Sequence, residues 1–183
     1  MSELPTYLLA YALLLAYGLI ILRLIVRREY QRRGRLSVLT ATLQGLLFFM
    51  YGGFPYFYLE GDWPAVDVNP FVHGIGITLL FGGLAILVYG MFRLGIIRSL
   101  GRGEKALEIS GIYQLTRNPQ ALACGLYVIG FAMLWPSWYA LGWAALYFIL
   151  IHTMILTEEE HLLRAYGQEY EKYSRKVPRY LGI

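Results

Sequence analysis

The sequence predicts an all-α integral membrane protein, and its composition and the length of its apolar stretches support this fold class. Of its 183 residues, 57% are hydrophobic and only 15% are charged, whereas about a quarter of a typical soluble domain is charged. Apolar stretches of about 17–25 residues, the length that crosses ~30 Å of hydrocarbon, recur along the chain. We therefore expect one membrane domain, residues 1–183, folded as a helical bundle.

The apolar stretches predict about five transmembrane helices. The third is long enough to tilt in the bilayer, and the last two form a helical hairpin that turns at Pro136. Small residues let membrane helices approach closely, and the third span carries six glycines: Gly74, Gly76, Gly82, Gly83, Gly90 and Gly95. A cytoplasmic C-terminal helix is expected after the fifth span. The predicted spans are residues 4–26, 36–59, 71–97, 121–135 and 137–157.

The basic residues predict the orientation of the chain. All 16 Lys and Arg lie after span five or in and beside the connections between spans one and two and between spans three and four, with Arg23 and Arg93 near the adjoining span ends. Such an excess marks the cytoplasmic side, so we expect the N-terminus outside and the C-terminus inside. This topology, with contacts to anionic membrane lipids, explains the net charge of +4; we expect no nucleic-acid partner. The single cysteine, Cys124, excludes an internal disulfide and a cysteine-rich metal site.

Two polar segments, residues 104–120 and 157–179, flank the hairpin, which would return both to the cytoplasmic face. In the first segment Arg117 precedes Asn118, where the following proline disfavours helical backbone. Pro119 can then start the fourth span, where its missing N–H costs nothing. An arginine held at this point is a forked donor suited to a carboxylate.

The second polar segment predicts one helix over residues 158–175. Five residues at successive spacings of four, three, four and three share one face of it. Glu159 is the only one of three consecutive glutamates on that face, where it could bind ribose hydroxyls or a cationic group. The tyrosines could enclose a planar or cationic ligand, and Pro178 ends the helix. The five residues are Glu159, Leu163, Tyr166, Tyr170 and Tyr173.

Two further polar residues are candidates for proton transfer. His152 lies within the fifth span, where an ionisable group is a functional candidate; a hydrogen-bonded packing role is the alternative. Glu160 follows Glu159 and could serve as a base. His161 has no second histidine four residues away, so no metal site is expected.

Read together, the two segments resemble the isoprenylcysteine carboxyl methyltransferase and phospholipid methyltransferase superfamily. The resemblance covers roughly the C-terminal half, and it implies an integral membrane enzyme that uses S-adenosylmethionine. Arg-Asn-Pro in place of the usual Arg-His-Pro is associated with prokaryotic members, which implies a bacterial or archaeal plasma membrane. The segments read Gly111-x-Tyr113-x-x-x-Arg117-Asn118-Pro119, then Glu159-Glu160-x-x-Leu163-x-x-Tyr166-Gly167-x-x-Tyr170-x-x-Tyr173-x-x-x-Val177-Pro178-Arg179.

The resemblance implies a cofactor pocket lined by Tyr113, Arg117, Asn118, Glu159, Tyr170 and Tyr173, with Gly111 shaping the loop. Arg117 would hold the methionyl carboxylate, and a lipophilic methyl acceptor would enter from the bilayer. A carboxylate acceptor, such as that of an isoprenylcysteine, needs no base, whereas an amine needs one, for which His152 or Glu160 is available. Two alternatives stay open. One is an NADPH-dependent sterol-type reductase, with Arg102, Lys105 and Arg175 as contacts to the 2′-phosphate, and the other is a non-enzymatic membrane protein with the same fold.

Overall fold

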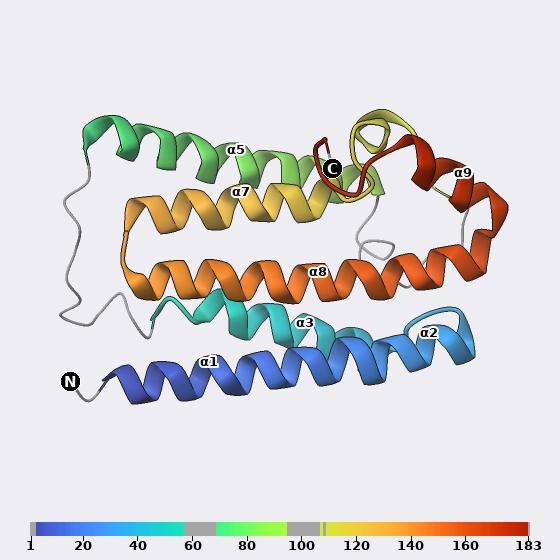
Figure 1. Cartoon of the computed structure of the whole chain (residues 1–183), viewed down its shortest axis with the longest axis horizontal. Helices are drawn as coiled ribbons and strands as arrows, with labels where there is room; N and C mark the ends of the chain where they lie inside the picture. Colours follow the sequence, from blue (N-terminus) through green and yellow to red (C-terminus); the bar gives the residue numbers. More distant parts are fainter. Residues whose placement is uncertain (1–2, 57–68, 95–106, 108, 183) are drawn as a thin grey trace.

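The computed structural model describes residues 3–56, 69–94, 107 and 109–182, and every long element in this part of the chain is a helix (Figure 1). Helices α5 and α7 lie side by side along one edge of the bundle, α8 runs through the middle, and α1 and α3 lie on its other side. The C-terminal part of α8, the short helix α9 and the start of α7 meet at one end of the bundle.

The N-terminal hairpin begins with one long apolar helix. It comprises α1 (Glu3–Leu19), a π-helical segment η1 (Ile20–Val26) and α2 (Arg27–Arg33). Gly34, with a φ of 67°, reverses the chain. Helix α3 (Val38–Gly53) follows, and the Ser37 side chain caps it by accepting from the Thr40 amide, which satisfies one of the free amides of its first turn.

Helices α5 (Pro70–Leu94) and α7 (Pro119–Leu134) pack through glycines, as the sequence predicted. A Cβ atom on Gly83 would lie 2.5 Å from the carbonyl oxygen of Ala123. One on Gly130 would lie 2.5 Å from the amide nitrogen of Leu80. The two backbones can be this close only because these positions carry no side chain. This close pairing holds the start of α7, and the polar segment before it, at a defined place.

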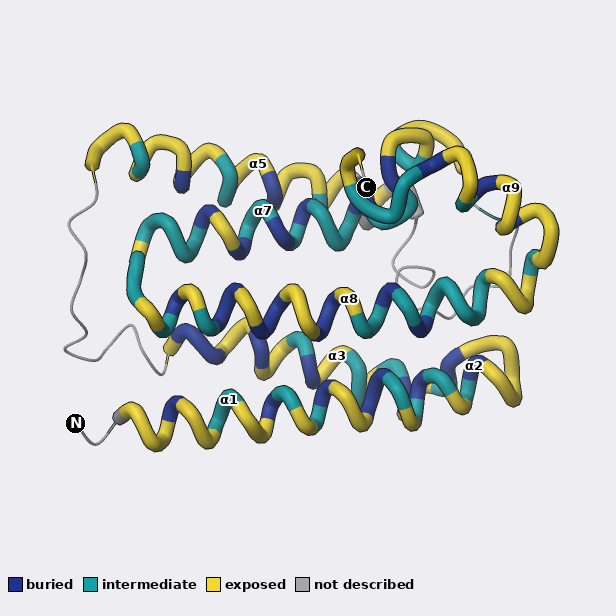
Figure 2. The backbone as a smooth tube through the Cα atoms, in the orientation of Figure 1, coloured by how far each residue is buried: buried dark blue, intermediate teal, exposed yellow. Residues whose placement is uncertain are grey.

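Helix α8 (Trp138–Tyr166) forms the centre of the bundle. Its buried positions, among them Trp143, Leu146 and Leu150, pack with α1 and α3, and Figure 2 shows buried and exposed positions alternating along it. At ~1.5 Å per residue its first twenty residues cover the ~30 Å of hydrocarbon. The polar part from Glu158 to Tyr166 therefore extends beyond the membrane core.

The observed helices match the predicted membrane fold in its main features. In the part of the chain that the structure describes, three apolar helices are long enough to cross a bilayer: Leu4–Arg33, Pro70–Gly90 and Trp138–Tyr166. Two shorter apolar helices, Val38–Gly53 and Pro119–Leu134, accompany them. The sequence also predicts a turn over residues 60–70, rich in Asp, Pro and Gly, and a helix break at Gly101-Arg-Gly103, and these lie mostly or wholly outside the described residues.

The prediction of a single helix over residues 158–175 is wrong. Helix α8 ends at Tyr166, Gly167 has φ 51° and ψ −123°, and α9 (Gln168–Lys176) starts in a new direction. Glycine adopts a positive φ with little steric cost, because it has no Cβ atom. Leu163, placed by the sequence on the tyrosine face, is exposed. The turn returns α9 over the end of the bundle, and α9 ends just before Pro178, as expected.

Candidate functional site

A cavity of about 240 Å³ lies at the end of the bundle where α8, α9 and the start of α7 meet. Six of the sequence-predicted residues line it, and Gln44 and Tyr30 of the N-terminal hairpin close its opposite side. The tertiary structure therefore brings together residues from both polar segments of the sequence. The six are Tyr113, Arg117, Asn118, Glu159, Tyr170 and Tyr173.

Arg117 is held in place by its backbone. Its amide donates to the carbonyl of Pro178, 3.0 Å away, and Asn118 has φ −129° and ψ 59°, outside the helical region as expected before a proline. Pro119 then begins α7. The Arg117 side chain lines the cavity and is only 12% exposed, so its guanidinium is largely shielded from solvent.

The carboxylate of Glu159 is shared by two arginines. Arg117 Nη1 lies 2.7 Å from Glu159 Oε1, and Arg179 Nη2 lies 2.6 Å from Glu159 Oε2. Hydrogen bonding to Glu159 raises the pKa of Arg179. Within the described structure Arg117 Nε is buried and has no hydrogen-bond partner. The Arg117 guanidinium therefore keeps one unsatisfied N–H, which could donate a hydrogen bond to a ligand in the cavity.

The two tyrosines of α9 connect the polar segments. The Tyr170 hydroxyl accepts from Arg117 Nη1 at 3.1 Å, and the Tyr173 hydroxyl donates to the carbonyl of Tyr113 at 2.7 Å. Both rings are buried. They position the turn η2 (Gly111–Gln114) against α9, and Gly111 starts that turn with a φ of 59°.

The chain after α9 returns to the segment before α7 and closes the site. The carbonyl of Arg179 accepts from Thr116 Oγ1 at 3.0 Å and from Asn118 Nδ2 at 3.1 Å. Thr116 Oγ1 also accepts from the Asn118 amide. The sequence showed no sign of a role for Thr116, and it placed Arg179 only at the end of the family motif. Hydrogen bonds between side chains and distant carbonyls leave no periodic pattern in the sequence.

Glu158 is a second cavity carboxylate that the sequence analysis passed over. It lines the same cavity as Glu159. Burial, and then the negative charge of Glu159, raise the pKa of the Glu158 carboxyl to about 7. Helical spacing puts Glu158 on one face with Met154 and Leu162, but only the fold shows that this face lines the cavity.

The two predicted proton-transfer residues are not among those that line the cavity. Glu160 forms ion pairs with Arg23 at 3.0 Å and Arg27 at 2.6 Å, on the N-terminal helix. Burial opposes its ionisation, but the hydrogen bonds from these arginines outweigh burial and lower its pKa. His152 is exposed on α8, and its Nδ1 lies 2.8 Å from the Tyr180 hydroxyl.

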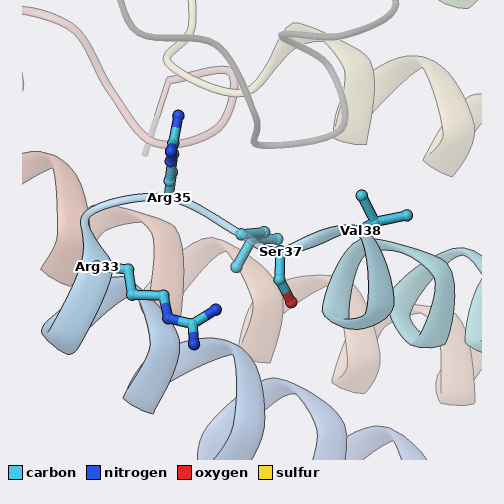
Figure 3. A pocket seen from close by; sticks show the side chains of 5 residues that line it. Arg33, Arg35, Ser37 and Val38 are labelled. Atoms are coloured by element: carbon cyan, nitrogen blue, oxygen red, sulfur yellow. The ribbon is translucent and has the colours of Figure 1, made fainter.

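A second hollow, of about 600 Å³, lies at the turn between α2 and α3 (Figure 3). Arg33, Arg35 and Ser37 line it. Arg33 pairs with Glu29, whose carboxylate also accepts from the Ser37 amide. The residues that line the hollow belong to a capped helix start, and none of the sequence-predicted site residues is among them. We therefore place the functional site at the smaller cavity.

A comparison with protein-family models decides the class of the protein. The model described as phospholipid methyltransferase matches residues 71–169, more than half of the chain. The chain belongs to this family. Enzymes of the family are membrane methyltransferases that use S-adenosylmethionine and act on lipid substrates, so the protein is a methyltransferase. Searches of curated proteins and of solved structures returned no match.

The family match covers only part of the cavity of this enzyme. It includes α5, α7 and α8 and ends at residue 169, before the tyrosines of α9. It also omits the N-terminal hairpin with Tyr30 and Gln44. Arg175, the one described residue among the three proposed NADPH contacts, is exposed and pairs with Glu171; residues 102 and 105 lie outside the described structure.

Proposed function

We propose that this enzyme transfers a methyl group from S-adenosylmethionine to a lipophilic acceptor at the cytoplasmic face of a membrane, with the cofactor bound at Arg117, Glu159 and the α9 tyrosines. The observation that carries the proposal is the buried cluster of Arg117, Glu159 and Tyr170, which lies within one cavity. Arginine and carboxylate side by side match the two charged ends of an amino acid.

The residues present fit a bound S-adenosylmethionine, which supplies an activated methyl group on a sulfonium sulfur. Arg117 Nε, buried and unpartnered in the described structure, can donate to the methionyl carboxylate. Glu159 can accept from ribose hydroxyls or the α-ammonium, and Tyr170 and Tyr173 can pack against the adenosyl part. The cavity is smaller than the about 300–1,000 Å³ of typical ligand pockets. The cavity must therefore widen when the cofactor binds.

The fold supports entry to the cavity from both the aqueous phase and the bilayer. We propose that the two shorter apolar helices, α3 and α7, also cross the membrane, which makes five spans, and that the site end is cytoplasmic. Basic residues of the α2–α3 turn and of α9 gather at that same end. A soluble cofactor then enters from the cytoplasm, while an acceptor with an apolar tail enters from the bilayer. The cofactor and the methyl acceptor would then meet among the polar residues at the membrane boundary.

Calorimetric titration of S-adenosylhomocysteine into the detergent-purified enzyme tests the cofactor assignment. We expect one saturable site, with affinity reduced about tenfold or more by Arg117→Ala, because a charge-assisted hydrogen bond to the carboxylate is lost. Arg175→Ala removes an equal charge from the exposed face of α9 and should leave the affinity unchanged. Absence of binding to the wild type, or equal effects of the two variants, would refute the assignment.

The same titration with NADPH examines the reductase alternative. We expect no saturable binding, since the family shown for this chain uses S-adenosylmethionine. Tight binding of NADPH, without binding of S-adenosylhomocysteine, would overturn the proposed cofactor. A protein that binds neither molecule would instead favour a non-enzymatic role.

A further inference from the structure

Four of the arginines on the first long helix form two pairs that face different ways. Arg23 and Arg27 turn toward α8, where both reach the carboxylate of Glu160. Arg28 and Arg32 are exposed, and no ion pair or hydrogen bond of either side chain is found in the described part of the chain. Residues four apart share one face of a helix. Arg28 and Arg32 therefore form an outward pair whose charge the described residues do not neutralise.

The outward pair continues a helix face that is exposed within the predicted first span. Leu24, four residues before Arg28, is 63% exposed. The distance along the helix from Leu4 to Leu24 is about 30 Å, which is the thickness of the hydrocarbon core. Arg28 then lies about 6 Å beyond the core and Arg32 about 12 Å beyond it. Since the headgroup region is about 5–8 Å deep on each side, Arg28 lies among the headgroups and Arg32 at their outer edge.

The turn after α2 adds positive charge and exposed apolar surface. Residues 27–35 contain five arginines and one acidic residue. Arg33 and Arg35 line the hollow at this turn, and their side chains extend to different sides of the chain (Figure 3). Donors that diverge in this way do not enclose a small soluble anion. Val38 and Leu39, at the start of α3, are largely exposed, so this region also offers contacts to acyl chains.

The charge of α2 also distinguishes it from α9, the other basic helix described at this end of the bundle. Helix α2 carries four arginines and one glutamate, whereas α9 carries three basic and two acidic residues. On α9, Arg175 is already paired with Glu171. A negatively charged ligand is therefore attracted more strongly to α2 than to α9.

Unpaired arginines beside exposed apolar side chains fit an amphiphile with a negative headgroup, and the arginine fork matches the oxygens of a phosphate. We propose that α2 binds an anionic phospholipid, with its phosphate between Arg28 and Arg32 and its acyl chains along Leu24. Neither arginine lines the cavity around Arg117, and both lie outside the residues that match the family. The bound lipid is therefore distinct from the methyl acceptor.

Lipid binding in dodecyl maltoside micelles, counted by native mass spectrometry, tests this proposal. Dioleoylphosphatidylglycerol and dioleoylphosphatidylcholine have the same tails and differ in net charge. We expect saturable binding of phosphatidylglycerol and at least about tenfold weaker binding of phosphatidylcholine. Glycerol 1-phosphate carries the phosphate without the tails and should show no saturable binding.

Three double variants locate the binding site. Arg28→Gln/Arg32→Gln should weaken phosphatidylglycerol binding about tenfold or more, because both charges beside the phosphate are lost. Arg28→Lys/Arg32→Lys keeps the charges and should weaken it much less. Arg164→Gln/Arg175→Gln is the matched control, because it removes two charges from exposed positions of α8 and α9, and it should change nothing. Thermal melts check that each variant is folded.

Three results would each overturn the inference: equal binding of the two lipids, undiminished binding by Arg28→Gln/Arg32→Gln, or an equal loss in the matched control. Binding of glycerol 1-phosphate as tight as that of phosphatidylglycerol would show a site for soluble anions instead. If the glutamine variant does not fold, titration of the wild type at about 0.1 M and 0.5 M NaCl decides, since an exposed ionic contact must weaken with salt and unchanged binding refutes it. The assay contains no cofactor, so its outcome is independent of the proposed methyl transfer.

Discussion

The two arginines around Glu159 allow a quantitative prediction of stability. Glu159→Gln removes the only carboxylate that Arg117 and Arg179 are seen to share. The Arg117 and Glu159 side chains are 12% and 14% exposed, so water cannot replace the lost partner. Removing one member of a buried ion pair costs about 3–5 kcal/mol. We expect about 3 kcal/mol here, at the lower end, because Tyr170 still accepts from Arg117 and Arg179 can turn toward solvent.

Thermal unfolding in detergent, followed by intrinsic tryptophan fluorescence, measures this loss. A loss of about 3 kcal/mol lowers Tm by about 6–12 °C in a chain of this size. Arg179→Gln should cost less, about 1 kcal/mol, because the pair of Arg117 with Glu159 remains. Glu171→Gln is the matched control, since its pair with Arg175 is exposed on α9, and it should change stability by no more than about 0.5 kcal/mol. If Glu159→Gln is no less stable than Glu171→Gln, the reasoning about the buried cluster is refuted.

Three further predictions concern other contacts. Gly83→Val should destabilise the protein by about 2 kcal/mol or more, whereas its neighbour Gly82→Val should not, since only Gly83 meets the backbone of α7; unfolding curves of both variants decide this. The raised pKa of Glu158, about 7, means that the folded state binds the proton more tightly, so stability falls as pH rises from about 4.5 to 7. Glu158→Gln should remove that fall, so its Tm should exceed that of the wild type above pH 7 but not near pH 4. A difference in Tm between the two proteins that stays constant with pH would contradict this. Tyr170→Phe should weaken binding of S-adenosylhomocysteine about threefold to tenfold, because Arg117 loses a hydrogen bond that orients it; calorimetry with an unchanged affinity would show that this bond plays no part.

Much of the membrane fold can be read from local pattern. Apolar length predicted the helices, because spanning segments must satisfy their backbone internally. The Asn118-Pro119 step predicted where α7 begins, because proline restricts the residue before it and fits the first helical turn. Glycines of α5 predicted close packing with a neighbouring helix, and the structure shows Gly76 and Gly83 against α7. Each of these features depends on residues that are near one another in the chain.

The candidate site was only partly predictable for the same reason. Helical spacing selected Glu159 and the tyrosines, and these do lie together at Arg117. The same spacing assumed one continuous helix, whereas Gly167 breaks it, and a glycine in a sequence does not reveal the sign of its own φ. Glu160 looked equivalent to its neighbours, yet it turns to Arg23 on another helix. Periodicity gives the face of a helix but not the partner of that face.

The sequence by itself determined that this is a helical membrane protein with two polar segments brought to one side of a hairpin, because hydrophobic length and charge placement act along the chain. Only the tertiary structure decided that Glu158 lines the cavity and that Gln44 and Tyr30 close it from the N-terminal hairpin. Those positions are more than a hundred residues from Glu158. Their meeting depends on how α2 and α3 pack on α8, which is set by side-chain fit across the bundle rather than by any local signal.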